Sequence, residues 1–433
     1  MQINGFSKLS KKDKINWLLK NFFSNDIAAK QILEKYWFND QDLQKLHDNF
    51  TENPISNYVL PYSVAPNFLI DNTLYAIPMV TEESSVVAAA AKAAKFWLTK
   101  GGFKTEVLGT TKTGHIHFIY TGSTTELFSF FKKIKTNILQ QIEPLQKSMQ
   151  QRDGGVKSIH LIDKTSELPN YYQVEFEFET VNAMGANFIN TILEQSAVVL
   201  QKKSREILTD NLQIIMSILS NYNPKNIVRA SVSCLLDELK TNELTGKEYA
   251  EKFVLALQIA EKDISRATTH NKGIMNGVDA VVIATGNDFR AVEAGAHSYA
   301  AQNGKYSSLS HARIKGNIFE FWLDLPLSIG TIGGLTSLHP LAKFSLNLLK
   351  NPSAKQLMSI IASVGLAQNF SAINSLITNG IQKGHMKMHL NNMLSLLNAT
   401  EAQRKQAIEY FNNKKISFNE LKNFLHKHQS RPK

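Results

Sequence analysis

The spacing of apolar residues predicts helices at the start of the chain. Apolar positions recur with a helical period after Ser10, which can cap the first helix, and again after Asp26. Two short apolar runs then flank Asp71-Asn72-Thr73, as in a β-hairpin. An alanine-rich helix follows, capped by Ser84 or Ser85 and ended by two glycines. These elements are predicted at 11–19, 26–36, 68–70, 75–77 and 86–100.

Alternating patterns appear in the next hundred residues and predict a different kind of domain. Strands and helices are expected there in the order β-β-α-β-β-α, which describes a small α+β sheet domain inserted in the chain. The six elements are predicted at 105–108, 115–120, 125–141, 159–162, 172–178 and 184–202.

Helical periodicity dominates the remainder, interrupted by two apolar runs that we interpret as strands. The last 50 residues are helical and polar in pattern, and Gly380 and Gly384 stand where that part begins, as at a hinge. The fold class expected is therefore α+β and multidomain. The predicted strands are 227–236 and 281–284, and the predicted helices are 246–260, 290–301 and two within 340–368.

Composition narrows the possible partners. The chain has 433 residues, enough for two or three domains, and its net charge of +11 favours anionic partners. Its basic residues form no aromatic-interleaved motif and no zinc-finger spacing, so nucleic acid is the weaker option. The single cysteine, Cys234, lies in an apolar run and is expected to be a buried thiol in a reducing compartment. We expect a cytoplasmic protein without a membrane segment, because no uncharged apolar run approaches 18 residues.

Two charged residues suggest a reactive site. Lys272 is expected in a loop that leads into the strand at 281–284, and Asp288 in the turn that follows that strand. If loop and turn meet, an ammonium and a carboxylate share a pocket with apolar walls, where each shifts the pKa of the other. An ordinary surface ion pair is the alternative interpretation.

Two loops carry small residues where helices are expected to begin. At 121–125 and 182–187, free backbone N–H groups at a helix N-terminus could receive phosphate. Neither loop has the GxGxxG spacing of a Rossmann unit. His385 and His389 share a helix face, but a metal needs a further ligand, so no metal is expected. His385 alone could protonate a thiolate.

Five segments in a fixed order carry a resemblance to a known family. The chain resembles class II, bacterial hydroxymethylglutaryl-CoA (HMG-CoA) reductases over nearly its whole length. The segments are Pro78-Met-Val-Thr-Glu-Glu-Ser-Ser-Val-Val-Ala-Ala-Ala, Arg266-Ala-Thr-Thr-His-Asn-Lys-Gly-Ile-Met-Asn-Gly, Ala284-Thr-Gly-Asn-Asp-Phe-Arg, Gly365-Leu-Ala-Gln-Asn and Gly380-Ile-Gln-Lys-Gly-His-Met.

The resemblance implies a catalytic role for four residues. Lys272 would stabilise the oxyanion formed when hydride reaches the thioester, with Asp288 bonded to it. His385 would protonate the departing CoA thiolate. Glu83 would protonate the mevaldehyde oxygen in the second hydride transfer, its pKa raised by Asp288.

The resemblance also assigns binding residues. Arg266 is the natural clamp for the substrate carboxylate, and the matching substrate positions are Ser85, Asn221, Arg266, Asn276, Gln368 and Asn369. The family's cofactor loop usually begins with aspartate, and this chain has Asn182 there. The loop at 121–125 offers hydroxyls and no carboxylate, which favours NADPH over NADH. The cofactor contacts expected are Ser123, Thr124, Thr125, Asn182, Met184, Gly185 and Asn187.

By resemblance, the chain is a cytosolic homodimer, or an assembly of dimers, that reduces HMG-CoA to mevalonate and CoA at sites across the subunit interface. A large, mostly helical domain would bind substrate (1–107 and 216–379), a small inserted ferredoxin-like α/β sandwich would bind the nicotinamide (108–215), and a helical flap would carry His385 (380–433). A non-catalytic CoA-binding or nucleic-acid-binding protein is the alternative.

Overall fold

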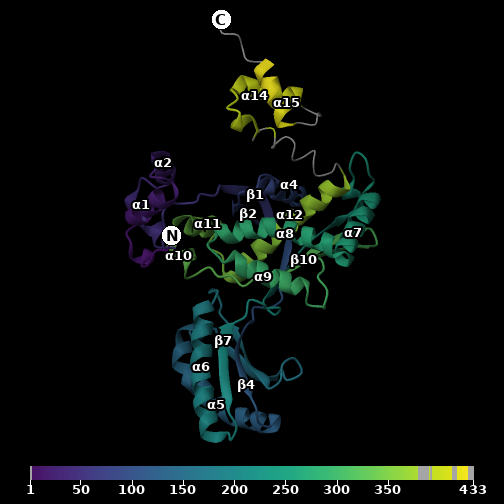
Figure 1. Cartoon of the computed structure of the whole chain (residues 1–433). Coiled ribbons are helices and arrows are strands. Elements are labelled where there is room, and N and C mark those ends of the chain that lie inside the picture. Colours follow the sequence, from purple (N-terminus) through teal and green to yellow (C-terminus); the bar gives the residue numbers. More distant parts are fainter. Residues whose placement is uncertain (1, 379–389, 391–392, 412–416, 428–433) are drawn as a thin grey trace. The chain divides into compact units, whose positions relative to one another are not determined.

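The computed structural model describes residues 2–378, 390, 393–411 and 417–427 (Figure 1). Helices and antiparallel sheets both contribute to it, so the predicted mixed class is confirmed. The chain divides into two compact units, Met1–Pro61 and Tyr62–Lys433.

The first unit is helical. Ser10 caps α1 by accepting a hydrogen bond from the backbone N–H of Asp13, and Asp26 caps α2 in the same manner. Both predicted helices are confirmed, and a third helix, capped by Asp40, was not predicted. Their bounds are α1 (Lys11–Phe22), α2 (Ile27–Lys35) and α3 (Gln41–Asp48), after a 3₁₀ turn, η1 (Phe6–Lys8).

The second unit opens with the predicted hairpin and alanine-rich helix. Strands β1 (Tyr62–Ile70) and β2 (Thr73–Val80) pair antiparallel around Asp71 and Asn72, both of which have positive φ. Helix α4 (Val86–Leu98) then packs on β1 and ends before Gly102. A Cβ on Gly102 would lie 2.4 Å from the carbonyl oxygen of Leu69, so only glycine lets the chain turn so closely under the hairpin.

A four-stranded sheet forms one wall of the main core. Its order is β3-β8-β10-β9, and every neighbouring pair is antiparallel. The inward face of β10 is fully buried through Phe319, Phe321 and Leu323, and α7 and α12 pack against this sheet. The elements are β3 (Lys104–Val107), β8 (Ile227–Leu235), β9 (Ser310–Lys315), β10 (Ile318–Pro326), η2 (Leu236–Leu239), α7 (Gly246–Lys262) and α12 (Ala354–Ile377).

Helix α12 passes through this core, with α4 and α8 against it (Figure 1). It is the one helix in the described part of the chain that is long and apolar enough to cross a membrane, and 72% of its most apolar window is buried inside the protein. Cys234 on β8 lies in the same core, and burial raises the pKa of its thiol to about 12. The predicted buried thiol is confirmed.

One predicted strand is wrong. The run at 281–284 is the last turn of helix α8 (Ile264–Ala284), and α9 (Phe289–Ala300) follows after a short turn. A short apolar run fits a buried helix as well as a strand, and packing decides between them. Gly277 lies against α12, where a Cβ would come within 2.9 Å of the Cβ of Gln368. The remaining helices of this core are α10 (Leu335–Leu338) and α11 (Pro340–Leu348).

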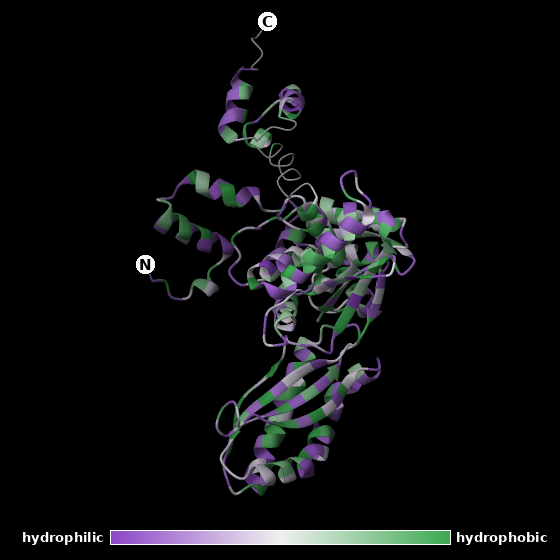
Figure 2. Cartoon of the chain, turned by 90° about the vertical axis from the view of Figure 1, so that its right-hand side faces the viewer, coloured by the Kyte–Doolittle hydropathy of each residue, from purple (hydrophilic) through white to green (hydrophobic). Residues whose placement is uncertain are grey.

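A second sheet has its own separate core. Its strand order is β5-β6-β4-β7, all antiparallel, and α5 and α6 supply buried residues against it. Figure 2 shows hydrophilic and hydrophobic residues alternating along these strands. The elements are β4 (Lys112–Tyr120), α5 (Thr124–Gln150), β5 (Gly155–Asp163), β6 (Tyr171–Glu179), α6 (Ala186–Ile207) and β7 (Leu212–Leu219).

The predicted order of strands needs two corrections here. The strand at 105–108 is β3 and belongs to the other sheet, where it pairs with β8. The fourth strand of this sheet is β7, which pairs with β4 and was not predicted. Its residues Ile214, Ile215 and Met216 break the alternating pattern around a β-bulge, so a period-2 signal is weak there.

The described C-terminal residues are helical, as predicted, and have a small core of their own. Helices α14 (Glu401–Tyr410) and α15 (Phe418–Lys427) pack through Phe411, Phe424 and neighbouring leucines. Thr400 caps α14 with a reciprocal capping box. Gly380, Gly384, His385 and His389 lie outside the described residues.

Candidate active site

Lys272 and Glu83 meet at the centre of the candidate site. Glu83 lies in the turn between β2 and α4, and Lys272 projects from α8, a helix rather than the predicted loop. The Lys272 Nζ donates to the Glu83 Oε2 at 2.7 Å. The two side chains are 61% and 40% exposed, so a ligand can reach the pair from solvent. An ammonium and a carboxylate from distant parts of the sequence thus share one accessible spot.

Backbone strain marks the turn that carries Glu83. Ser85 has a φ of 74°, in the left-handed region that disfavours residues with a side chain, and it is the N-cap of α4. Its hydroxyl donates to the carbonyl of Ser84 and does not cap the helix. Such conformations cost about 1–3 kcal/mol and cluster at functional sites.

Asp288 is held apart from Lys272. Its carboxylate caps α9 by accepting from the backbone N–H groups of Arg290 and Ala291, and the Arg290 Nε lies 3.3 Å away. Between Lys272 and its end at Ala284, α8 rises about 18 Å. The predicted bond between Lys272 and Asp288 does not form in this structure.

Asn287 and Gly286 fix the turn before Asp288. The Asn287 side-chain oxygen accepts from the backbone N–H of Gly330 at 2.8 Å. Gly286 has a φ of 69°, and a Cβ there would meet Ala342 and the backbone of α10 at 3.1 Å. The carboxylate of Asp288 is therefore delivered by a rigid turn, as predicted for a turn residue.

A buried chain of hydrogen bonds positions Asn369. The Ser310 hydroxyl donates to the Asn369 Oδ1 at 2.7 Å, and the His270 Nε2 lies 2.7 Å from the same hydroxyl. Burial, and then the charges of Arg266 and His311, lower the pKa of His270 to about 3. A neutral imidazole can donate from Nε2 to Ser310, which leaves its buried Nδ1 without a donor. This polar chain locks the amide of Asn369 in one orientation.

Two predicted substrate residues have unused polar groups. Burial lowers the pKa of the half-buried Arg266 guanidinium, which stays charged, and no partner of that guanidinium is found within the described part of the chain. The Gln368 Oε1 is buried and accepts no hydrogen bond from any described residue. Asn276 lies one turn beyond Lys272 on α8 and is half-buried, whereas Asn221 is exposed after β7.

The loop at 182–187 is organised by a buried lysine. The Lys112 Nζ donates to the carbonyls of Met184 and Ala183 at 2.8 and 3.0 Å, and to the Thr180 hydroxyl. Burial, opposed by the charge of Glu179, lowers the pKa of Lys112 to about 8. Gly185, with a φ of 94°, then starts α6.

Asn182 has a structural role that its position in the sequence did not reveal. Its Oδ1 accepts from the backbone N–H of Ala354, the first residue of α12, at 2.9 Å. Its carbonyl accepts from the N–H of Thr331. The side chain thus ties the loop to the central helix of the core, a task that aspartate could also perform. Asn187 is exposed in the first turn of α6.

The loop at 121–125 is exposed and forms the start of α5. Ser123 is the N-cap without a side-chain hydrogen bond to the helix, and the Thr124 hydroxyl lies 2.7 Å from the Tyr172 hydroxyl. Asp210, which was not predicted as a site residue from the sequence, also lies near this loop. A Cβ on Gly122 would lie 2.6 Å from its carboxylate, so an acidic group does stand beside this loop.

Lys112, Asp210 and His270 are the site residues that the sequence pattern did not identify. Lys112 and His270 occupy ordinary strand and helix positions, and only burial makes them notable. Among described residues, no group of three potential metal ligands is present. His385 lies outside the residues that the structure describes.

Comparison with known proteins decides the family. The protein-family model that describes hydroxymethylglutaryl-coenzyme A reductases matches residues 14–390 of this chain. The chain belongs to the HMG-CoA reductase family. It is 35% identical to the Archaeoglobus fulgidus 3-hydroxy-3-methylglutaryl-coenzyme A reductase over 94% of this chain and 90% of that protein. A probable 3-hydroxy-3-methylglutaryl-coenzyme A reductase of Borreliella burgdorferi is 33% identical to this chain. The match covers 91% of this chain and 89% of that protein.

Solved reductase structures agree with this assignment. A class II HMG-CoA reductase from Streptococcus pneumoniae, bound to NADPH in open conformations, is 35% identical. The structural match covers 98% of this chain and 100% of the Streptococcus pneumoniae chain, with a TM-score of 0.73. The class II resemblance seen in the sequence of this HMG-CoA reductase family member is therefore confirmed.

Proposed function

We propose that this chain reduces HMG-CoA to mevalonate and CoA, consuming two NADPH and two protons, in the mevalonate pathway of isoprenoid synthesis. The observation that carries the proposal is the contact of Lys272 with Glu83 in a chain of the HMG-CoA reductase family. The pair places an ammonium and a carboxylate side by side at an accessible surface. The family assignment, more than the ion pair itself, disfavours a protein that only binds CoA or nucleic acid.

Three of the four catalytic residues have a defined chemical task in the proposal. Bound NADPH supplies the hydride. Lys272 donates a hydrogen bond to the oxygen that gains negative charge as hydride reaches the thioester carbon. His385 protonates the CoA sulfur as the C–S bond breaks, which leaves mevaldehyde. Glu83 donates a proton to the aldehyde oxygen during the second reduction.

Substrate binding uses the unpaired groups around α8 and α12. Arg266 is proposed to hold the free carboxylate of the hydroxymethylglutaryl group, because its guanidinium has no partner among the described residues. The buried Gln368 Oε1 would accept from the substrate hydroxyl and so gain its missing partner. Asn369, whose amide oxygen accepts from Ser310, is proposed to offer its amide nitrogen to the substrate. Ser85, Asn221 and Asn276 complete the proposed set.

The site is proposed to be shared between two subunits. Lys272 lies within α8 and Asp288 lies beyond the C-terminal end of that helix, and each pairs with another residue in this structure. We propose a homodimer or an assembly of dimers in which Asp288 of the partner subunit lies beside Lys272. We also propose that the enzyme is cytoplasmic. Its proposed parts are a large domain at 1–107 and 216–379, a small domain at 108–215 and a flap at 380–433.

Two helix N-termini fit the phosphates of NADPH. The first residues of α5 and α6 have no side-chain cap, since Ser123 and Gly185 make no such hydrogen bond. Their free N–H groups are suited to anions. We propose contacts from Ser123, Thr124, Thr125, Asn182, Met184, Gly185 and Asn187. The reductase bound to NADPH supports this cofactor.

Asp210 provides a test of cofactor choice. We expect wild-type turnover to favour NADPH over NADH, and Asp210→Asn to lower the KM for NADPH about threefold. Removing a carboxylate beside Gly122 removes repulsion of the 2′-phosphate. Steady-state kinetics with both cofactors measures this. A strong wild-type preference for NADH, or an unchanged KM for NADPH in the variant, would contradict the assignment.

Lys112 should control cofactor binding through the loop at 182–187. Lys112→Met removes three hydrogen bonds, two of them to loop carbonyls. We expect the KM for NADPH to rise about tenfold, with a far smaller change in the KM for HMG-CoA. Lys157→Met, on an exposed position of β5, is the matched control. Equal effects on both KM values would show that the loop does not serve the cofactor.

A further inference from the structure

Two carboxyl groups meet between α8 and α9. Asp279 lies on α8 and Glu293 on α9, and the two side chains are in hydrogen-bonding contact. Asp279 is half-buried, and its Oδ1 is shielded from solvent without accepting a hydrogen bond from any described residue. Two ionised carboxylates have no hydrogen-bond donor between them, so this contact requires that one of the two groups carries a proton.

Burial places that proton on Asp279. Removal from water, and then the charge of Glu293 and the hydrogen bond with it, raise the pKa of Asp279 to about 8. At neutral pH Asp279 is therefore a carboxylic acid, and its O–H donates to a carboxylate, which makes a strong hydrogen bond. The unpaired Oδ1 is tolerated because a neutral acid loses less on burial than a carboxylate does.

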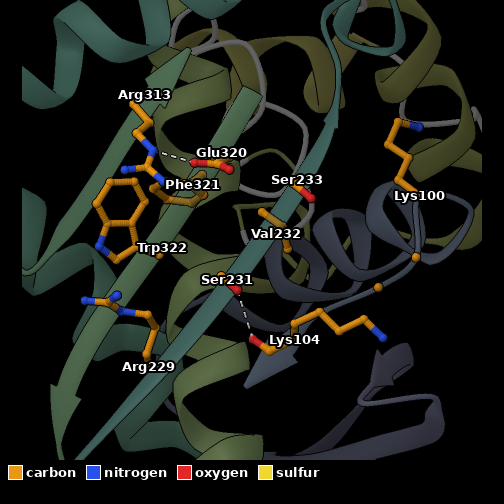
Figure 3. Close-up of a pocket in the computed structure, with 12 residues that line it drawn as sticks. Lys100, Lys104, Arg229, Ser231, Val232, Ser233, Arg313, Glu320, Phe321 and Trp322 are labelled. Atoms are coloured by element: carbon orange, nitrogen blue, oxygen red, sulfur yellow. Dashed lines mark hydrogen bonds and ion pairs between the residues drawn. The ribbon is translucent and has the colours of Figure 1, made fainter. Parts of the chain in front are cut away.

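The nearest charged residues on the same helices and on β10 have other partners. On α8 and α9 these pairs are Lys272 with Glu83, Arg290 with Asp288, and the His297 Nδ1 with the Tyr306 hydroxyl. On β10, which packs against α9, the pairs are Glu320 with Arg313 (Figure 3) and Asp324 with Arg229. None of these groups supplies a counter-charge to Asp279.

The other elements packed against α8 supply no counter-charge either. They are β2, which has no charged residue, and the helices α4, α7, α11 and α12. Their charged residues are those of α7 together with Lys92, Lys95, Lys343 and Lys355. Within the described chain, Glu293 is the one charged group that shifts the pKa of Asp279. The position of the proton is thus decided between the two carboxyl groups.

The carboxyl pair connects the two helices that carry proposed catalytic residues. Asp279 follows Lys272 by seven residues, almost two turns, so both side chains lie on one face of α8, with Asn276 between them. Glu293 follows Asp288 by five residues on α9. The hydrogen bond therefore joins the helix that carries Lys272 to the helix that Asp288 caps, across the turn at 285–288.

We propose that Asp279 and Glu293 share one proton, and that their hydrogen bond holds α9, and with it Asp288, in place relative to α8. Both are positioning residues, because they act through the helix that Asp288 caps. Loss of the proton brings two negative charges into contact and pushes α9 away from α8. The role toward Asp288 rests on the proposed reaction, whereas the shared proton does not.

Melting temperatures measured across pH test the shared proton. Folded protein keeps on Asp279 a proton that the unfolded chain releases above about pH 4, so stability falls as pH rises towards 8 and changes no further above it. Asp279→Asn keeps a donor to Glu293 but cannot titrate. We expect the melting temperature of wild type to fall by several degrees relative to Asp279→Asn between about pH 5 and pH 8, and the difference to stay constant at higher pH.

The rate of HMG-CoA reduction across pH tests the positioning of Asp288. Between about pH 7 and pH 9, kcat of wild type should fall about tenfold more than kcat of Asp279→Asn, because a group with a pKa near 8 is about nine-tenths ionised at pH 9. Asp279→Ala removes the donor and should lower kcat about tenfold at pH 7, where Asp279→Asn stays close to wild type. Other groups titrate equally in wild type and Asp279→Asn, so their comparison isolates the pair.

Each outcome decides one part of the proposal. Asp237→Asn removes an exposed carboxylate on η2 and should follow wild type in both pH profiles. A difference in melting temperature between wild type and Asp279→Asn that does not change with pH would overturn the shared proton. Superimposable pH profiles of kcat for these two proteins would overturn the positioning of Asp288. Absence of turnover in wild type would count against the proposed reaction, because the melting temperatures decide the shared proton without activity.

Discussion

We expect Lys272→Ala to lower kcat for HMG-CoA reduction about a thousandfold, because one preorganised donor to a developing oxyanion is worth about 10²–10³ in rate. The loss should fall on kcat more than on KM, since the interaction strengthens only as charge develops. Steady-state rates of NADPH oxidation measure both parameters.

The fold should not suffer from this change. The Lys272–Glu83 pair is more than a third exposed on both sides, so its contribution to stability is at most about 1 kcal/mol. The melting temperature of the variant should stay within a few degrees of wild type. Lys262→Ala, an exposed lysine at the end of α7, is the matched control. A variant at Lys272 with the wild-type kcat would show that another group stabilises the oxyanion.

Glu83→Gln should have the second large effect. Glutamine can still accept a hydrogen bond from Lys272, but it cannot deliver a proton, and loss of a general acid costs about 10²–10⁴ in rate. We expect reduction of added mevaldehyde to mevalonate to fall by this factor. The half-reaction isolates the second hydride transfer, in which Glu83 is proposed to act.

The adjacent carboxylate provides a strict control. Glu82→Gln removes the same charge one residue away, at an exposed position where the carboxylate pairs with no described residue. It should retain wild-type reduction of mevaldehyde. If Glu83→Gln also retained it, while Lys272→Ala lost activity, Glu83 would serve only to hold Lys272.

Local signals in the sequence predicted the elements that depend on neighbouring residues. Ser10 and Asp26 cap the helices expected of them, and the Asp71-Asn72 turn forms the expected hairpin. The segment at 281–284 is helical although its pattern predicts a strand, because α8 packs against distant elements, α12 among them, and Val281, Val282 and Ala284 are buried. Periodicity along the chain carries no information about such contacts.

The sequence named some members of the candidate site but not their pairings. The family motifs located Lys272, Glu83 and Asp288, but the partner of Lys272 depends on where α8 crosses the turn before α4. The importance of Lys112 depends on burial against the loop carbonyls. Both facts follow from tertiary packing, which brings together residues far apart in the sequence.

The stoichiometry of the complete reaction tests the central claim most directly. Purified protein is mixed with limiting HMG-CoA and excess NADPH, and the loss of NADPH absorbance is compared with the thiol released. The account predicts two NADPH oxidised for each CoA and each mevalonate formed. No HMG-CoA-dependent oxidation of NADPH or NADH by the folded protein would contradict it.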